Sequence, residues 1–551
     1  MKTDASLSYE MTLTFEDRSC WTVSWLLQER ARTHADAVYL DVPETGERYT
    51  YNETLETARR LGSGLVEAGM SQGDRLVMFL PNCSELIFAW LGCNAYGLID
   101  VAINTDFSGP FLAHQVRVAE PRFAIVSPNY VQRFIDIGDA ATSIERYYIT
   151  GEGAEQRDAI KLLLSTGVAA SAFDELKIDD LVPLPEISPG MPASILFTSG
   201  TTGPSKAVTL SNGQMIFFAD QCVYMTNLTE ADSYMSVGPL FHGNTRFLAA
   251  LPPIVTGGRY ILCSRFSASS WIDFIRDSGA TVTNYVGVMM DLVWKQPPRP
   301  DDADNDLRCI FTVPVASSVE DQFCARFGVK DIVTVYGLTE ICMPIITPLN
   351  VKRPPDACGV ALTDWFDLQL VNSETDQPVE IGEVGELIVR PREPWTIFSQ
   401  YWGMPAETVN AWRNLWFHTG DGLRRDADGW YYFVDRVSDS MRRRGENISS
   451  YEIEQAVLGH SGVLQCAAVA VPAELETGED EVMLCIVPDG QLETTELFEW
   501  CVETLPRFAL PKYIKLMDDM PRTPSGKLRK FELRGAGTEG ADVMRTVPRP
   551  K

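Results

Sequence analysis

The amino-acid sequence predicts an α/β protein. A large N-terminal domain of mostly parallel sheets flanked by helices, with a β-rich subdomain, precedes a small mobile α+β domain. Three observations support this prediction. Apolar runs alternate with segments of helical periodicity over residues 22–286, which is typical of parallel sheets covered by helices. Beyond about residue 364 the period becomes two, as in antiparallel strands. The 551 residues also exceed a single hydrophobic core.

The first half of the chain is expected to alternate between helices and strands after an extended lead-in over residues 1–20. Helices are predicted from Thr22 to Asp36 and from Asn52 to Gly69, where apolar residues recur at helical spacing. Leu86–Ile103 reads as a buried helix running into a strand, because polar residues interrupt it too often for a membrane span. Further predicted elements are strands at 37–40, 74–80, 123–126, 195–197, 258–262, 281–286 and 331–335 and a helix at 269–279.

The second half is expected to form antiparallel strands and then a separate small domain. Strands are predicted at 367–371, 385–390 and 429–434, with a turn at Asp428-Gly429. We expect an N-terminal domain over residues 1–436, a hinge over 437–440 and a C-terminal domain over 441–551. The last domain is predicted to contain helices at 450–458 and 494–505, strands at 463–471 and 482–487, and a disordered tail from about 535.

The composition excludes some classes of partner and of site. With 75 acidic and 47 basic residues the formal net charge is −28, and such a surface repels nucleic acids. The polar N-terminus lacks the apolar segment of a signal peptide. The twelve cysteines include no Cys-x-x-Cys pair, so neither a zinc site nor a disulfide framework is indicated. A cytoplasmic protein without integral membrane association is expected.

The stretch from Ala193 to Val208 joins an apolar strand to a polar loop with the chemistry of a phosphate-binding loop. Two glycines let backbone N–H groups turn inward, four hydroxyls add neutral donors and a lysine adds positive charge. These residues are Thr198, Ser199, Gly200, Thr201, Thr202, Gly203 and Lys206. Pro204 and Ser205 separate the second glycine from the lysine, so this is not a Walker A loop. A plain surface turn has a similar composition.

Four further segments carry residue types suited to nucleotide chemistry. Tyr336, at the expected exit of a strand, can stack on a purine, and Glu340 can hold Mg²⁺. Asp421 can accept from a ribose diol to which Arg436 can donate. Lys527 lies on a Pro- and Gly-rich turn. Taken singly, each segment also suits an ordinary structural role. The segment with Tyr336 suits a turn at the end of a strand, Asp421 suits a turn-forming aspartate, and Lys527 suits a surface lysine. The fourth, the basic run Arg442–Arg444, also suits a solvated face.

Together, five motifs in this order resemble those of the adenylate-forming superfamily, which comprises acyl-CoA synthetases, carrier-loading adenylation domains and beetle luciferases. They are Thr198–Lys206, Tyr336–Glu340, Trp416–Asp421, Asp435–Ile448 with Tyr451–Glu454, and Pro521–Lys530, and the resemblance extends over roughly residues 22–530. Arg442–Ser449 and Leu505–Ala509 look most like the subgroup that contains carnitine and crotonobetaine CoA ligases.

The resemblance implies a role for each motif. The first loop clamps the β- and γ-phosphates of ATP with Lys206 as helper, Tyr336 faces adenine, Thr339 contacts the α-phosphate, and Glu340 and Thr202 bind Mg²⁺. Asp421 and Arg436 hold the ribose, and Lys527 enters the site for adenylation. Gly445 lines the pantetheine tunnel, Arg444 and its neighbours favour the phosphates of coenzyme A, and the small domain rotates about Ser438.

This sequence departs from the family pattern in three places. Asp435 replaces a glycine, Ser438 replaces the usual charged hinge residue, and Thr312–Ser317, with Ala316, replaces the usual Gly-Gly-Ala-Pro adenine shelf. His242, grouped with Lys527, Glu340 and Thr339 as catalytic, lies beside Phe241 at the family's junction of acyl pocket and tunnel. Both are gate candidates, although a structural histidine is the commoner case. The acyl-pocket candidates are Phe241, Tyr285, Val288, Met289, Val315, Leu338 and Met343, which suit a medium-sized or cyclic acid.

The sequence therefore predicts an ATP-dependent, AMP-forming carboxylic acid:CoA ligase. ATP, Mg²⁺ and coenzyme A are the implied cofactors and cosubstrates, and a homodimer is left open. One alternative is a stand-alone adenylation enzyme that loads a carrier-protein thiol, and another is a catalytically silent nucleotide-binding homologue. The intact residues Lys206, Glu340, Asp421, Arg436 and Lys527 argue against the silent homologue. Luciferase-type chemistry is excluded only weakly, because it shares the first half-reaction.

Overall fold

The computed structural model describes residues 11–198, 205–286, 289–313, 315, 319–349, 351–373, 375–436, 441–443, 446–448, 450–473, 480–521 and 530–544. The chain divides into two compact units. Unit 1 contains residues 1–105, 116–196 and 207–435, and unit 2 contains residues 106–115, 197–206 and 436–551. The hinge residue Ser438 lies outside the described residues, so its role stays a prediction.

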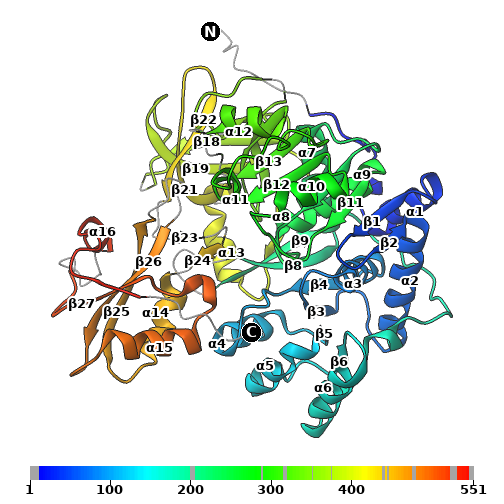
Figure 1. Ribbon diagram of the computed structural model, residues 1–551, viewed down its shortest axis with the longest axis horizontal. Coiled ribbons are helices and arrows are strands. Elements are labelled where there is room, and N and C mark those ends of the chain that lie inside the picture. Colours follow the sequence, from blue (N-terminus) through cyan, green and yellow to red (C-terminus); the bar gives the residue numbers. More distant parts are fainter. Residues whose placement is uncertain are drawn as a thin grey trace. The chain divides into compact units, whose positions relative to one another are not determined.

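A seven-stranded sheet forms one layer of unit 1, in the order β14-β13-β12-β10-β11-β1-β2 (Figure 1). All neighbouring strands of this sheet pair in parallel, except that β2 pairs antiparallel with β1. The strands are β1 Val38–Val42, β2 Glu47–Thr50, β10 Ser233–Ser236, β11 Arg259–Leu262, β12 Val282–Val286, β13 Cys309–Val313 and β14 Asp331–Val333.

An eight-stranded sheet has the order β20-β9-β8-β4-β3-β5-β6-β7. From β8 to β7 its strands pair in parallel, whereas β20 is antiparallel to β9. The strands are β3 Arg75–Phe79, β4 Ile99–Ala102, β5 Phe123–Val126, β6 Arg146–Ile149, β7 Ala169–Ala172, β8 Pro192–Thr198, β9 Lys206–Ser211 and β20 Gln400–Tyr401.

The predicted β-rich subdomain is a seven-stranded sheet whose order is β15-β16-β17-β22-β21-β19-β18. The pairings for which the register is defined are all antiparallel, as the period-two pattern predicts. Its strands are β15 Val335–Leu338, β16 Cys342–Ile346, β17 Gly359–Ala361, β18 Phe366–Val371, β19 Val384–Pro391, β21 Phe417–Arg425 and β22 Trp430–Arg436.

Two helices near the N-terminus begin directly after a threonine that caps them. Thr22 caps α1, and Thr50 forms a capping box with Glu53 at the start of α2, so two donors of the first turn are satisfied. The helices before residue 436 are α1 Val23–Thr33, α2 Tyr51–Glu67, α3 Ser84–Ala95, α4 Gly109–Ala119, α5 Val131–Asp136, α6 Gly153–Ser165, α7 Asn212–Thr226, α8 Gly243–Thr245, α9 Leu251–Thr256, α10 Trp271–Ser278, α11 Met289–Trp294, α12 Glu320–Phe327 and α13 Pro405–Ala411. Arg246–Ala250 form a π-helical turn.

Residues 450–543 of unit 2 form a small α+β arrangement. A four-stranded sheet has the order β25-β26-β27-β28, and β23 pairs with β24. The strands are β23 Met441–Arg443, β24 Glu446–Ile448, β25 Val463–Pro472, β26 Asp480–Pro488, β27 Tyr513–Leu516 and β28 Asp542–Val543, and the helices are α14 Ser450–Leu458, α15 Thr494–Thr504 and α16 Lys530–Gly535. The prediction of a disordered tail from about 535 is wrong as far as Met544, because β28 pairs with β27.

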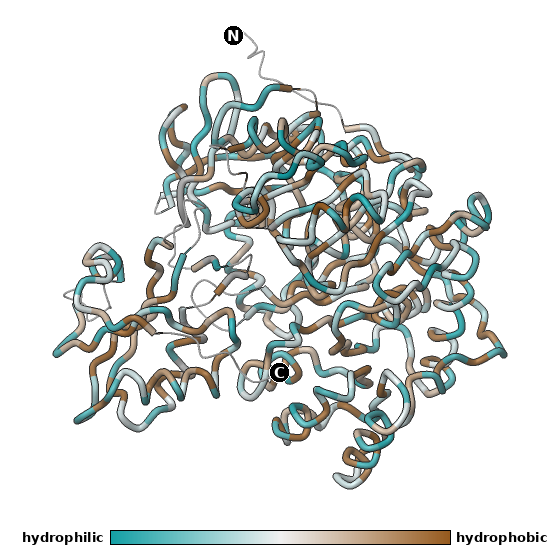
Figure 2. The backbone as a smooth tube through the Cα atoms, viewed as in Figure 1, coloured by the Kyte–Doolittle hydropathy of each residue, from teal (hydrophilic) through white to brown (hydrophobic). Residues whose placement is uncertain are grey.

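Among the described residues of unit 1, apolar side chains form a larger and a smaller core, besides a small cluster of Ala357, Val360 and Trp430. The larger contains α3, α7 and one face of both parallel sheets, and the smaller packs α10 and α12 against the other face of β12 and β13. In Figure 2, hydrophobic residues lie mainly along the interior strands and hydrophilic residues mainly in the outer loops. None of the described helices is both long enough and apolar enough to span a bilayer. All twelve cysteines lie in the described part of the chain and are free thiols.

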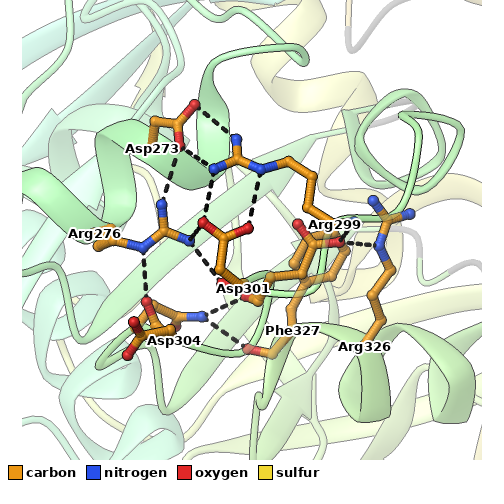
Figure 3. A network of polar contacts seen from close by, with 9 residues as sticks. Asp273, Arg276, Arg299, Asp301, Asp304, Arg326 and Phe327 are labelled. Carbon is orange, nitrogen blue, oxygen red and sulfur yellow. Dashed lines mark hydrogen bonds and ion pairs between the residues drawn. The ribbon is translucent and has the colours of Figure 1, made fainter.

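Charged side chains hold the loop between α11 and β13 against α10 and α12 of the smaller core (Figure 3). Arg299 bridges Asp273 of α10 and Asp301 of the loop, at 2.9 Å and 3.0 Å. Arg276 pairs with the same two carboxylates. The hydrogen bond from Arg299 lowers the pKa of Asp273. Because most of these groups are partly exposed, the network orders the loop more than it stabilises the fold.

A fully buried ion pair lies deeper in unit 1. Arg246 of the π-helical turn contacts Asp100 of β4 at 2.5 Å, and neither side chain is exposed. Asp100 also accepts hydrogen bonds from Asn94 and Ser194, at 3.1 Å and 2.9 Å. The Arg246 guanidinium lies 4.6 Å from the Trp90 ring centre. The pair thus joins β4, β8, α3 and the π-helical turn.

We predict that removing one member of this pair is far more damaging than replacing both. Asp100→Ala leaves the buried Arg246 charge uncompensated and is expected to cost about 3–5 kcal/mol, whereas Asp100→Leu with Arg246→Met should come close to the wild type. Thermal and urea unfolding of both variants measure this difference. Equal losses in the single and the double variant would contradict the prediction.

A second buried carboxylate anchors the N-terminal lead-in to α7. The Asp220 side chain is 2% exposed, and the Thr14 amide donates to its two carboxylate oxygens at 3.2 Å and 3.0 Å. The Thr14 hydroxyl donates as well, at 2.5 Å. Burial raises the pKa of Asp220 to about 6, against the opposing effect of these hydrogen bonds.

Asp220 is expected to make the protein less stable as the pH rises. Since the pKa is raised on folding, the folded protein holds the proton more tightly, and its free energy of unfolding should fall by roughly 3 kcal/mol between about pH 4 and pH 6. Asp220→Asn should remove this part of the pH dependence. Urea unfolding at several pH values compares the two proteins, and parallel curves would refute the assignment to Asp220.

Candidate active site

The tyrosine motif lies where the chain passes from one sheet to another. β14 ends at Val333 in the parallel sheet and β15 begins at Val335 in the antiparallel sheet. Tyr336 follows the predicted strand, which ends earlier than expected, but lies within the next strand, β15, and not in a loop. The turn comes later, between β15 and β16. Gly337 is required within β15, where the register shifts, because a Cβ atom would lie 2.2 Å from the carbonyl oxygen of Cys342.

Glu340 is placed in this turn by hydrogen bonds from two other elements. Its backbone carbonyl accepts from the Phe398 amide at 2.7 Å and from the Gln214 side chain of α7 at 3.2 Å. Gln214 also donates to the Thr339 carbonyl. The Glu340 carboxylate, 7% exposed, accepts from the Tyr401 hydroxyl at 2.9 Å. Burial and the nearby carboxylate raise the pKa of Tyr401, which keeps the phenol a donor.

Tyr336 and Asp421, which the sequence assigns to adenine and ribose, are in direct contact. The Tyr336 hydroxyl donates to the Asp421 carboxylate at 2.8 Å, and both residues are buried. Asp421 lies within β21 at a bulge, and Gly420 there has a φ of +71°. Gly420 and Asp421 therefore lie inside β21 and not at the end of a strand.

A third carboxylate shapes the bulge that carries Asp421. Glu386 of β19 is 6% exposed and accepts from the Gly420 amide at 3.0 Å, while its other oxygen lies 3.1 Å from Nδ1 of His418. The Thr419 hydroxyl accepts from the Asp421 amide. Arg436 ends β22, but its side chain lies outside the described residues. Of the two residues predicted to hold the ribose, the structure therefore describes the side chain of Asp421 only.

Much of the predicted phosphate loop and catalytic segment lies outside the described residues. Thr198 ends β8 and Lys206 begins β9, both partly buried. The predicted site residues that are not described are Ser199, Gly200, Thr201, Thr202, Gly203, Val288, Ala316, Ser438, Arg444, Gly445 and Lys527. The roles of these residues stay predictions.

The described gate and pocket residues do not form one cluster. Phe241 and His242, partly buried, follow β10 with ring centres 4.6 Å apart. Met343 is buried in the larger core, and Leu338 packs against it. Tyr285, by contrast, is buried in the smaller core, where its ring lies 5.6 Å from that of Trp271.

The remaining two pocket candidates do not restore a common cluster. Met289 packs against the smaller core, and Val315 is partly buried. Tyr285 and Met289 thus lie apart from the larger core, to which Met343 and Leu338 belong. Tyr285 is a core residue in the described structure.

One arginine of the basic run has a structural role within unit 2. Arg443 pairs with Glu481 at 2.8 Å and donates to the Leu510 carbonyl at 2.5 Å. The expectation that the whole run serves coenzyme A is therefore wrong for Arg443. Lys530, three residues after Lys527 in the sequence, pairs with Glu454 of α14 at 2.7 Å and donates to Ser450.

Three residues of this site were not predicted from the sequence. Hydrogen bonds connect the motif residues to Glu386, Gln214 and Tyr401. The bonded residues lie 34 to 126 positions apart along the chain. Strand register and helix packing bring them together, and nothing in their local sequence marks them. The motif residues, in contrast, share recognisable local patterns.

Comparison with known proteins identifies the family. The family of AMP-binding enzymes matches residues 27–402, and the C-terminal domain of AMP-binding enzymes matches residues 452–527. The chain belongs to the AMP-binding enzyme family. This match confirms the predicted superfamily, the use of adenylate chemistry and the α/β fold with its small C-terminal domain.

Curated relatives and solved structures point the same way. A crotonobetaine/carnitine–CoA ligase of Salmonella heidelberg is 28% identical over 492 residues, covering 88% of this chain and 93% of that protein. The o-succinylbenzoate CoA synthetase structure from Bacillus subtilis has a TM-score of 0.76 at 22% identity, covering 92% and 97% of the two chains. ATP-bound MatB from Rhodopseudomonas palustris has a TM-score of 0.66 at 23% identity, covering 94% and 99%. The prediction of an AMP-forming enzyme of the acyl-CoA ligase family is thereby confirmed.

Proposed function

We propose that this enzyme joins a free carboxylic acid to coenzyme A at the expense of ATP. The observation that carries the proposal is the contact between Tyr336 and Asp421, with Glu340 four residues beyond Tyr336. Side chains suited to a purine and to a ribose diol are thereby hydrogen-bonded to each other, and the carboxylate suited to a metal-bound phosphate lies in the turn after the same strand. The family and its CoA ligase relatives support the same conclusion.

The reaction proceeds in two displacement steps. In the first, an oxygen of the acid's carboxylate attacks the α-phosphorus of ATP, the bond to the β-phosphate bridge breaks, and pyrophosphate leaves. In the second, the thiolate of coenzyme A attacks the acyl carbon, and the carbon–oxygen bond to AMP breaks. No enzyme nucleophile is required, so the protein acts by orientation and by stabilising charge.

Each site residue has a distinct task in this proposal. Tyr336 stacks on adenine, Asp421 and Arg436 hold the ribose, and the loop from Thr198 to Lys206 binds the terminal phosphates. A carboxylate that is buried and already oriented suits Mg²⁺, so Glu340, with Thr202, would hold that ion. The ion would neutralise phosphate charge. The ammonium group of Lys527 stabilises the charge that develops as pyrophosphate leaves.

The acid substrate is to be identified by testing acids of different chemical classes. Because Tyr285 and Met289 lie apart from the larger core, an apolar pocket built from all seven candidates has no support in the described residues. We therefore favour a panel that includes acids with quaternary ammonium groups, aromatic acids and medium-chain acids. A carrier-protein thiol remains the alternative acceptor.

We expect pyrophosphate release that depends on one class of acid, and an acyl-CoA product when coenzyme A is present. A coupled pyrophosphate assay across the panel, with and without coenzyme A, measures both. An enzyme that releases no pyrophosphate with any acid refutes the proposal. Acyl-AMP that accumulates despite coenzyme A points instead to a carrier-protein acceptor.

Lys527→Ala is expected to separate the two steps. Adenylation should slow by about 100-fold or more, since a charge that acts in the transition state is lost. The reaction of supplied acyl-AMP with coenzyme A should stay within a few-fold of the wild type. Lys515→Ala, which removes a partly exposed lysine of β27, is the control and should leave both rates unchanged. Equal loss of both steps in Lys527→Ala would contradict the assignment.

A further inference from the structure

A short segment, residues 398–402, is hydrogen-bonded to the strand that leaves the phosphate loop. Gln400 and Tyr401 form β20, which pairs antiparallel with β9 opposite Thr209 and Val208. The Ser399 amide donates to the Thr209 carbonyl at 3.2 Å, and the Trp402 amide donates to the Ala207 carbonyl at 2.7 Å. Residues 399–402 are therefore hydrogen-bonded alongside β9, the strand that starts at Lys206.

The same segment is also bonded to the turn that carries Glu340. The Phe398 amide donates to the Glu340 carbonyl at 2.7 Å, and the Tyr401 hydroxyl donates to the Glu340 carboxylate at 2.9 Å. Phe398 and Tyr401 pack with ring centres 4.8 Å apart and are 2% and 3% exposed. The backbone bond sets where the turn lies, and the hydroxyl bond sets where the carboxylate points.

We propose that Tyr401 is a positioning residue that orients the metal-binding carboxylate of Glu340 and keeps it in register with β9. This inference rests on the proposed function, because it takes Glu340 as the Mg²⁺ ligand. In this role Tyr401 acts through Glu340, by holding one carboxylate oxygen so that the carboxylate is oriented before MgATP arrives.

Two physical effects make this bond important. A glutamate side chain has several rotamers, and a hydrogen bond from a buried, rigid phenol selects one of them before binding, which reduces the entropy lost on metal binding. A neutral donor also adjusts the electron density of a ligand oxygen without cancelling its charge, as is usual for groups that support a metal ligand. Removing such a supporting group typically weakens metal binding on the order of 10-fold.

The experiment compares Tyr401→Phe with a matched control. Tyr401→Phe keeps the buried ring and deletes only the hydroxyl. Tyr39→Phe does the same for a fully buried tyrosine of β1, whose hydroxyl donates to the Ala250 carbonyl at 3.0 Å. Calorimetric titration measures ATP binding with Mg²⁺ and with a chelator, so neither the acid nor turnover is needed.

For Tyr401→Phe we expect MgATP affinity to fall on the order of 10-fold while the affinity for metal-free ATP stays unchanged. Tyr39→Phe should change neither affinity, even if it unfolds at a lower temperature. In a Glu340→Asp background the shortened carboxylate no longer meets the hydroxyl, so adding Tyr401→Phe should have little further effect. These three results together support the inference.

The opposing results are equally specific. A Tyr401→Phe variant that keeps the full gain in affinity from Mg²⁺ refutes the positioning role and leaves the proposed function intact. So does an equal loss from Tyr401→Phe in the Glu340→Asp and wild-type backgrounds. Wild-type ATP binding that does not respond to Mg²⁺ refutes the metal assignment of Glu340, and with it this inference.

Discussion

The buried pair of Asp100 and Arg246 is the constraint on which the centre of unit 1 depends. Two opposite charges at 2.5 Å, with no exposure, are stable only while each has the other and its hydrogen bonds. Those bonds fix β4, β8 and α3 with respect to the π-helical turn. The amide of Arg246 in turn donates to the carbonyl of His242. The segment with the two gate candidates is therefore anchored by a charge in the core.

A second constraint is the shape of the antiparallel sheet. β15 and β21 are separated by three strands in the order of that sheet, which in a flat sheet would place them about 19 Å apart. Their side chains Tyr336 and Asp421 nevertheless meet at 2.8 Å. The sheet must therefore curl until its first and fifth strands face each other. The groups proposed for adenine and ribose meet because of that curvature, which no local pattern records.

This contrast separates what the sequence can predict from what it cannot. Periodicity and capping residues predict α2, β3, β11 and α14 closely, because they depend on neighbours along the chain. The motif residues Tyr336, Glu340 and Asp421 were also found, since local patterns mark them. Their supports, Glu386 and Tyr401, depend on strand register and could not be found this way. Tyr285 and Met343 belong to different cores, which the sequence does not reveal because the two faces of a sheet look alike in sequence.

The arrangement of supports bears on how one site performs two reactions. Tyr336, Asp421 and Glu340 belong to unit 1, and so do Glu386, Gln214 and Tyr401, whose buried hydrogen bonds hold the bulge at Asp421 and the turn at Glu340. Shifting any of them between half-reactions would leave buried polar groups unpaired, at a cost of about 1–3 kcal/mol each. Lys527 and Gly445, which serve one half-reaction each in the proposal, lie beyond residue 436 instead. The exchange of groups between the two steps is therefore expected from residues of that later part of the chain, while Tyr336, Asp421 and Glu340 keep their contacts.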